Sequence, residues 1–195
     1  MSRMILYDDA AARGFEPFAL TRPVAAFIFT CASLSVPSAE ASDFASKRPA
    51  ARVEYWQKRQ ATIDTQVADV ASLPAVKLVF VGDSITDFWL LDDDPWIPGR
   101  IHGRRIWDES FNGAVPRNLA LNIGISGDRT EHLLFRILPK SQGGLGQLDA
   151  EALAPEFFVL MVGINNSYAA EPPVADSVFE GVLAVMRALH ARKPC

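Results

Sequence analysis

The sequence predicts a three-layer α/β/α fold in which helices cover both faces of a parallel sheet. Three short apolar runs, bounded by proline, glycine or polar residues, are typical of buried strands. They are Val76–Val81, Leu119–Ile125 and Phe157–Val162. Because helical stretches alternate with these runs, the strands are expected to be parallel. The chain of 195 residues is long enough for one domain with a short extension.

The helices are predicted from apolar residues that recur at helical spacing. The first helix is expected over Ala51–Ala71 and ends before Pro74, which pushes the residue preceding it out of the helical region. The apolar residues near one face of this helix are Val53, Trp56, Ile63, Val67 and Val70. Further helices are expected over Thr130–Leu138 and Ala175–Ala191. Leu90–Pro116 contains three prolines and is predicted to be a long loop with one helical turn, of the kind that is often functional.

The first 43 residues differ in character from the rest, so we divide the chain into an arm, 1–43, and a domain, 44–195. Val24–Val36 is an apolar run too short to span a bilayer as a helix, and Ala39-x-Ala41 after it fits a signal-peptidase site. We expect a periplasmic or secreted protein if Val24–Ala41 is a working signal segment, and a cytoplasmic one otherwise. Met4–Val24 loosely resembles the start of nucleotidyltransferase-like proteins, without their phosphate-binding glycine loop.

Composition excludes several classes of function. Apolar residues make up 49% and charged residues 22% of the chain, which are ordinary globular values. The net charge is −4 and the sequence contains no stripe of Lys and Arg, so nucleic acid is not an expected partner. With only Cys31 and Cys195, neither a disulfide framework nor a cysteine zinc site is expected, and we predict no metal and no organic cofactor.

Small polar segments follow all three predicted strands. They are Gly82–Ser84, Gly124–Asp128 and Gly163–Asn166. Ligands bind at the carboxyl ends of the strands in open α/β sheets, so a serine hydroxyl, a glycine amide and a carboxamide are expected to meet in one crevice. This is the inventory of acyl transfer, a nucleophile together with oxyanion donors. Each segment alone is more often a turn or a helix cap, and only their succession favours catalysis.

Three blocks then resemble a known family. They are VFVGDSITDFW, LNIGISGDRTEHLLFRI and VLMVGINN, at Val79–Trp89, Leu121–Ile137 and Val159–Asn166. In this order they are similar to the blocks of the SGNH, or GDSL, hydrolases, and most similar to the branch of the platelet-activating-factor acetylhydrolase catalytic subunits. The resemblance covers about Arg52–Lys193. It implies an SGNH (flavodoxin-like) fold that is incomplete at the C-terminus.

The resemblance also implies a role for each matching residue. Ser84 corresponds to the nucleophile, and the oxyanion hole to the N–H of Ser84, the N–H of Gly127 and the side-chain amide of Asn165. Asp83 is expected to orient the local backbone. Asn166 occupies a position where many members have Asp and this branch commonly has a second Asn. The implied reaction is the hydrolysis of carboxylic esters with small acyl groups, acetyl above all, through an acyl-serine intermediate.

The sequence departs from the family at the base. The family's last block, Asp-x-x-His, supplies the base and its orienting carboxylate, and this sequence contains no Asp-x-x-His. We therefore weigh His102, in the long loop, and His190, in the last turn of the last helix, as substitute bases. A packing role is the better interpretation of His132.

Two function hypotheses follow. The first is an esterase that acts on a small-molecule ester and does not span a membrane. The second is a catalytically impaired fragment that only binds ligand or forms oligomers. We also expect a homo-oligomer, because Phe157–Val162 is apolar on both faces and backbone groups beside it lack partners. Two features of the long loop have open interpretations. Trp89, Trp96 and Trp107 line either a substrate pocket or a satellite cluster, and Asp92–Asp94 is more consistent with a solvated run than with a cation site.

Overall fold

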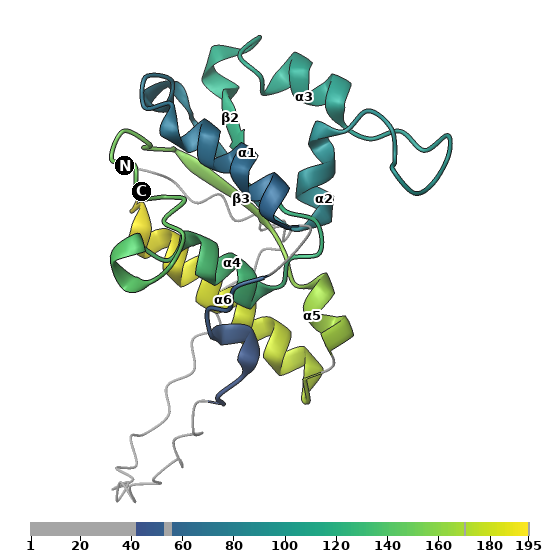
Figure 1. Ribbon diagram of the computed structural model, residues 1–195, viewed down its shortest axis with the longest axis vertical. Helices are drawn as coiled ribbons and strands as arrows, with labels where there is room; N and C mark the ends of the chain where they lie inside the picture. Colours follow the sequence, from purple (N-terminus) through teal and green to yellow (C-terminus); the bar gives the residue numbers. More distant parts are fainter. Residues whose placement is uncertain (1–41, 53–55, 170, 195) are drawn as a thin grey trace, which may run out of the picture. The chain divides into compact units, whose positions relative to one another are not determined.

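The computed structural model describes residues 42–52, 56–169 and 171–194. The chain divides into Met1–Ser42 and Asp43–Cys195, and the fold described below is that of the second unit. The predictions for the arm and for Val53 lie outside the described residues. The helices and strands, all but β1 labelled in Figure 1, are α1 (Trp56–Ala68), β1 (Leu78–Gly82), α2 (Ser84–Asp87), α3 (Arg104–Ser110), β2 (Ala120–Asn122), α4 (Thr130–Ile137), β3 (Phe157–Met161), α5 (Ile164–Ala169) and α6 (Val174–Arg192). The short 3-10 helices are η1 (Ala45–Lys47), η2 (Leu73–Ala75), η3 (Phe88–Leu90), η4 (Pro116–Asn118) and η5 (Lys140–Gln142).

The three strands form one parallel sheet in the order β2-β1-β3. Leu78 of β1 is in register with Ala120 of β2 and with Phe157 of β3. The predicted strands are thereby confirmed, although β2 ends at Asn122, three residues earlier than expected. Its chain nevertheless continues along β1, because the N–H groups of Ile123 and Ile125 donate to Phe80 and Gly82 of that strand.

The main core lies on one face of the sheet. Val79 and Val81 of β1 are fully buried on this face, and β3 contributes Phe158 and Leu160. The buried core residues from the helices around them are Trp56, Ile63, Leu133, Leu134, Ile137, Val185 and Leu189. Figure 1 shows α4 and α6 side by side in this layer. The apolar stripes of three helices therefore bury one side of the central strand.

A smaller aromatic cluster covers the other face of β1. Phe80, which alternates with Val79 and Val81, packs edge-on against Trp107 of α3 and Phe111, with ring centroids 5.2 Å and 5.1 Å away. Trp89 joins the cluster at 6.5 Å from Phe80. The three-layer α/β/α architecture is thus confirmed. The satellite cluster is also the correct interpretation for Trp89 and Trp107.

The long loop and the regions next to the motifs hold more helix than predicted. Helix α3 runs for seven residues within Leu90–Pro116, where the sequence predicts one turn. Helix α5 follows β3 immediately, although the sequence indicated no helix there. Val70 is 60% exposed beyond the end of α1, so its assignment to the buried face was wrong.

The prediction that both faces of β3 are buried was also wrong. Phe157, Val159 and Met161 point away from the main core and are 58%, 41% and 50% exposed. They lie in register with Leu78, Phe80 and Gly82 of β1. The aromatic cluster covers Phe80 but leaves the neighbouring side chains of β3 open. Among the described residues, β3 pairs with β1 alone, so its outer edge has no strand partner.

We expect this edge and its apolar face to associate with a second copy of the chain, since both features favour association. Light scattering should then give a mass of at least two chains, and Val159→Glu should shift it towards one chain. Val70→Glu is a matched control, because Val70 is a similarly exposed valine outside the sheet. A single-chain mass for the unsubstituted protein at every concentration would contradict the expectation.

Candidate active site

The carboxyl ends of the three strands are joined by hydrogen bonds around Ser84. Ser84 begins α2 directly after β1, the central strand. On one side the N–H of Ile125 donates to the carbonyl oxygen of Gly82 at 3.1 Å. On the other side the N–H of Asp83 donates to the carbonyl oxygen of Met161 at 3.3 Å. The turn that carries the serine is therefore held between the segments that follow β2 and β3.

Asp83 shapes this turn from beneath. Its side chain is fully buried, and Oδ1 accepts a hydrogen bond from the N–H of Ile85 at 3.0 Å, which caps α2. Oδ2 is buried without a hydrogen-bond partner among the described residues. Burial raises the pKa of Asp83, and the nearby Asp128 adds to the shift. Ser84 itself, unlike Asp83, is only partly buried.

The segment after β2 is tied to the serine turn through Asp87. Asp87 Oδ2 accepts from the N–H of Ser126 at 3.0 Å, and Oδ1 accepts from Arg59 Nε at 2.9 Å. Burial raises the pKa of Asp87 despite the opposing effect of the Arg59 guanidinium. The last residue of α2 thus fixes the backbone just before Gly127.

Gly127 has a φ of +79°, a backbone conformation that residues other than glycine rarely adopt. The Arg52 guanidinium lies beside it. A Cβ on Gly127 would lie 3.1 Å from Arg52 Nη2. Arg52 Nη1 donates to the carbonyl oxygen of Ser126 at 2.9 Å and to Asp128 Oδ1 at 3.1 Å. A residue from before α1 therefore packs directly on the predicted oxyanion loop.

Asp128 is the buried centre of this loop. Its fully buried carboxylate accepts from Arg52, from Trp56 Nε1 at 3.1 Å and from Arg136 Nε at 2.8 Å. Arg136 is also fully buried and donates from Nη1 to the carbonyl oxygen of Ile123 and to Gln147 Oε1, both at 2.7 Å. Burial lowers the pKa of Arg136, and Asp128 opposes the shift. The Asp128–Arg136 ion pair compensates two charges that are both shielded from solvent.

The two asparagines after β3 have different partners. Asn165 Nδ2 donates to the backbone carbonyl of Asp128 at 2.7 Å, which joins the segment after β3 to the loop after β2. Asn166 is buried, and its Oδ1 accepts from the N–H of Thr130 at 3.0 Å, at the start of α4. Its Nδ2 donates to Thr130 Oγ1 and to Glu131 Oε2. Asn166 therefore anchors the start of α4, whereas Asn165 is partly exposed.

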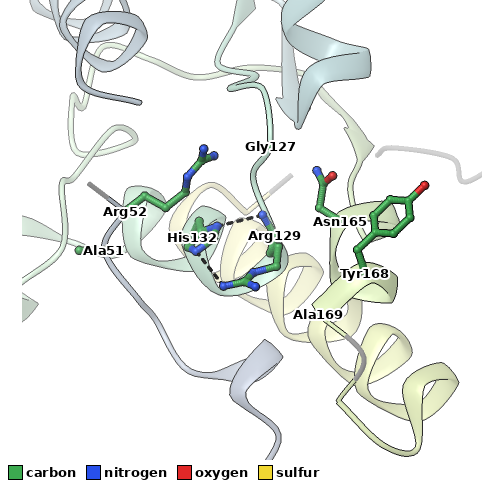
Figure 2. A pocket seen from close by; sticks show the side chains of 8 residues that line it. All are labelled: Ala51, Arg52, Gly127, Arg129, His132, Asn165, Tyr168 and Ala169. Atoms are coloured by element: carbon green, nitrogen blue, oxygen red, sulfur yellow. Dashed lines mark hydrogen bonds between the residues drawn. The ribbon is translucent and has the colours of Figure 1, made fainter. Parts of the chain in front are cut away.

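Gly127 and Asn165 line one cavity of about 480 Å³. In Figure 2, Arg52 and His132 lie on one side of Gly127, whereas Asn165 and Tyr168 lie on the other side. The described residues that line it are Ala51, Arg52, Gly127, Arg129, His132, Asn165, Tyr168 and Ala169. The structure thus brings two of the three predicted catalytic residues into one cavity. Ser84 is not part of its lining and lies at the end of the adjoining strand β1.

His132 lines this cavity as a neutral ring that caps a helix. Its Nδ1 accepts from the backbone N–H of Arg129 at 3.1 Å at the start of α4. Burial lowers its pKa from an ordinary 6.5 to about 4, and the Arg129, Arg52 and Arg136 guanidinium groups add to the shift against the effect of Asp128. A ring that resists protonation in this way is a weak base.

This shift predicts a pH dependence of stability. Between pH 6.5 and about 4 the unfolded chain protonates His132 and the folded chain does not. The contribution of His132 to the free energy of unfolding should therefore be complete above pH 6.5 and fall as the pH drops towards 4, by up to about 3 kcal/mol. Urea titrations across this range should show a smaller fall for His132→Gln, which keeps a capping acceptor. His190→Gln, at an exposed site, should leave the profile unchanged, and equal slopes for all three proteins would contradict the prediction.

The other two histidines lie in different surroundings. His102 Nε2 is 3.1 Å from Asp94 Oδ2, and its ring packs on Phe88 with centroids 4.8 Å apart. His190 is exposed in the last turn of α6. That turn lies at the end of the sheet opposite Ser84, because Arg192 and Lys193 contact Asp149 and Ala150, in the segment that precedes β3.

Asp92 and Asp93 are exposed, as the interpretation of the acidic run as solvated predicts, and Asp94 is the exception. Its side chain is buried and accepts from the N–H groups of Trp96 and Ile97 at 2.8 Å and 2.9 Å. The Trp96 hydrogen bond leads a set of contacts that lower the pKa of Asp94. The Trp96 ring contacts Phe88 but is largely exposed, and it is not among the residues that line the cavity. The part of the chain that the structure describes contains no cluster of three metal-ligating side chains and no helix long and apolar enough to cross a membrane.

Sequence reasoning did not identify Arg52, Asp87 or Arg136 as parts of this site. Arg136 stands out in the sequence as a charged residue within the apolar segment HLLFRIL, and such a residue needs a buried partner. Arg52 gives no such signal, because its partner Asp128 is 76 residues away along the chain.

A parallel sheet with a serine at the end of its central strand, and with glycine and asparagine segments at the ends of its neighbours, defines an SGNH-type α/β hydrolase fold. A model described as the GDSL-like Lipase/Acylhydrolase family matches residues 80–195. The chain belongs to this family.

Its curated relatives include subunits of platelet-activating factor acetylhydrolase. The chain is 30% identical over 118 residues to the IB subunit alpha1 of Bos taurus and of Homo sapiens. It is 31% identical over 117 residues to the IB subunit alpha2 of Rattus norvegicus. Each match covers 60% of this chain and spans only 39% of the relative's length.

Proposed function

We propose that the protein hydrolyses carboxylic esters through an acyl-serine intermediate on Ser84, with small acyl groups favoured. The observation that carries this proposal is the hydrogen-bonded junction of the three strand ends. It places the serine turn between the loop that carries Gly127 and the segment that carries Asn165. Family membership supports the same chemistry, and the name acetylhydrolase of the similar subunits supports a small acyl group.

In this reaction Ser84 Oγ attacks the ester carbonyl carbon and loses its proton to a base. The carbonyl oxygen becomes an oxyanion that accepts from the N–H groups of Ser84 and Gly127 and from Asn165 Nδ2. The bond to the leaving alcohol then breaks, and the base returns its proton to the alcohol oxygen. Water repeats the sequence on the acyl-serine and releases the acid.

The contacts of Asn165 suit this role. One N–H of its amide is held by the carbonyl oxygen of Asp128, and the described residues offer the second N–H no partner. A donor fixed through its neighbour in this way is oriented before the substrate arrives. Donors of this kind contribute about 10²–10³-fold to the rate.

For the base we propose His102. It is the histidine that carries a carboxylate partner, Asp94, among the described residues. It packs on Phe88, which lies four residues, about one helical turn, after Ser84. His132 is a weak base because its pKa is about 4, and His190 lies at the opposite end of the sheet. A carboxylate–imidazole pair both orients the ring and stabilises its protonated form.

His102→Asn is accordingly expected to lower kcat by about 10²-fold or more, since general-base catalysis contributes about 10²–10⁴-fold. His190→Asn serves as the control and should retain the parental rate. Both rates are measured with 4-nitrophenyl acetate by release of nitrophenolate. Equal rates for both variants would exclude His102 as the base.

The proposed function itself is tested by an acyl-length series of 4-nitrophenyl esters, combined with intact-mass analysis of the protein during turnover. We expect the acetate to be hydrolysed faster than longer esters and a transient adduct of one acyl group. The alternative, a catalytically impaired protein that only binds ligand or forms oligomers, predicts no turnover and no adduct.

A further inference from the structure

The cavity beside Gly127 and Asn165 is lined by cations, whereas the carboxylates that pair with them lie behind. The Arg52 and Arg129 side chains are 23% and 37% exposed. Their partners Asp128 and Glu131 are 0% and 7% exposed. No carboxylate is among the described residues that line the cavity. A ligand that enters it therefore meets guanidinium groups and not the acids that balance them.

The ion pairs around the cavity share few carboxylates among their guanidinium groups. Arg52 and Arg136 share the single carboxylate of Asp128. Arg129 Nε lies 2.6 Å from Glu131 Oε1, without the alignment of a hydrogen bond. Guanidinium groups stay protonated in proteins. Asp87 lies near Arg136 and Asp83 lies near Asp128, so these carboxylates add negative charge behind the cavity and not among its described lining residues. The His132 ring adds no charge at neutral pH, because its pKa is about 4.

One guanidinium nitrogen of Arg52, a residue that lines the cavity, makes no hydrogen bond with the described residues. Both hydrogen bonds of Arg52 to the oxyanion loop use Nη1. Its Nη2 lies beside Gly127, and the described residues offer it no hydrogen-bond acceptor. Guanidinium groups bind carboxylates with particular geometric fit. An anionic group in the cavity would therefore find a donor next to the oxyanion amide.

We propose that this cavity is a subsite for an anionic group, and that the preferred substrates are esters that carry a carboxylate in the part that occupies it. The inference rests on the proposed ester hydrolase function and adds the substrate class. Arg52 and Arg129 are the specificity-determining residues. The carboxylate belongs either to the acyl group or to the alcohol, and the two arms of the test separate these sources.

The kinetic test compares charged and neutral esters in matched pairs. For the acyl arm the pair is 4-nitrophenyl hemisuccinate and its methyl ester, and for the alcohol arm it is 4-acetoxybenzoate and its methyl ester. In one arm the anionic ester should have a kcat/KM about tenfold higher. Arg129→Gln should remove most of this preference and Arg129→Lys should retain it. Arg105→Gln is the matched control, because Arg105 is 81% exposed on α3 and outside the cavity lining.

A binding test makes the inference independent of turnover. In calorimetry the Ser84→Ala protein should bind succinate or 4-hydroxybenzoate more tightly than succinamide or 4-hydroxybenzamide. Sodium chloride at ~0.5 M should weaken this binding about tenfold, since salt screens partly exposed charges. Arg52→Gln and the salt series both report on the subsite if Arg129→Gln does not fold.

The two proposals fail in different ways. Equal hydrolysis of charged and neutral esters, together with equal binding of anions and amides, would overturn the subsite and leave the esterase intact. Absence of hydrolysis with any ester would overturn the esterase, and the calorimetry would still decide the subsite. Anion binding that is identical in Arg129→Gln, Arg52→Gln and Arg105→Gln would also overturn the inference.

Discussion

Ser84→Ala is expected to lower kcat for 4-nitrophenyl acetate by about 10³-fold or more and to abolish the acyl adduct. The reason is that removal of a nucleophile leaves only the contribution of the oxyanion donors and of binding. The fold should be unaffected, because the hydrogen bonds that shape this turn come from the side chain of Asp83 and from the backbone.

Ser141→Ala provides the control, since Ser141 is an exposed serine in η5. Its rate should equal that of the parent, and the two variants should unfold at the same urea concentration. If Ser84→Ala keeps the parental turnover, another group or a contaminant performs the reaction, and the assignment of Ser84 is wrong.

Arg136→Met is expected to reduce the free energy of unfolding by about 3–5 kcal/mol, the range for breaking a buried ion pair. The substitution leaves Asp128 with fewer donors, and it also removes the partner of the Gln147 side chain and of the Ile123 carbonyl. Buried acceptors that lose their donors bear the cost of desolvation.

Equilibrium urea unfolding measures this effect, with Arg105→Met as the exposed counterpart. The control should change stability by less than about 0.5 kcal/mol. Adding Asp128→Asn to Arg136→Met should recover part of the loss, because the uncompensated carboxylate is then removed. A loss no larger than that of the control would mean that the pair is structurally dispensable.

Much of the fold was predictable because it depends on local patterns. The three strands were recognised from short apolar runs, and the helices α4 and α6 from their helical spacing. Helix α5 was not predicted. Its six residues, INNSYA, follow a glycine and contain few strong helix formers. Asn166, from within this helix, is held by Thr130 and Glu131 of α4.

The exposed face of β3 shows the limit of pattern reasoning. Phe157, Val159 and Met161 alternate with Phe158 and Leu160, and all five are apolar, which favours burial on both faces. Whether a layer covers a given face depends on where other elements pack. Here the aromatic cluster around Phe80 stops at β1 and leaves β3 open.

The sequence by itself determined the α/β class, the order of the strands along the chain, and the polar segments that carry Ser84, Gly127 and Asn165. These follow from periodicity and from short motifs, which are properties of neighbouring residues. Only the tertiary structure decided that Asp128 binds Arg52, Trp56 and Arg136, that His132 stays neutral, and that arginines line the cavity. The partners and the solvation of a charge are set by residues distant in the chain, so no local pattern could reveal them.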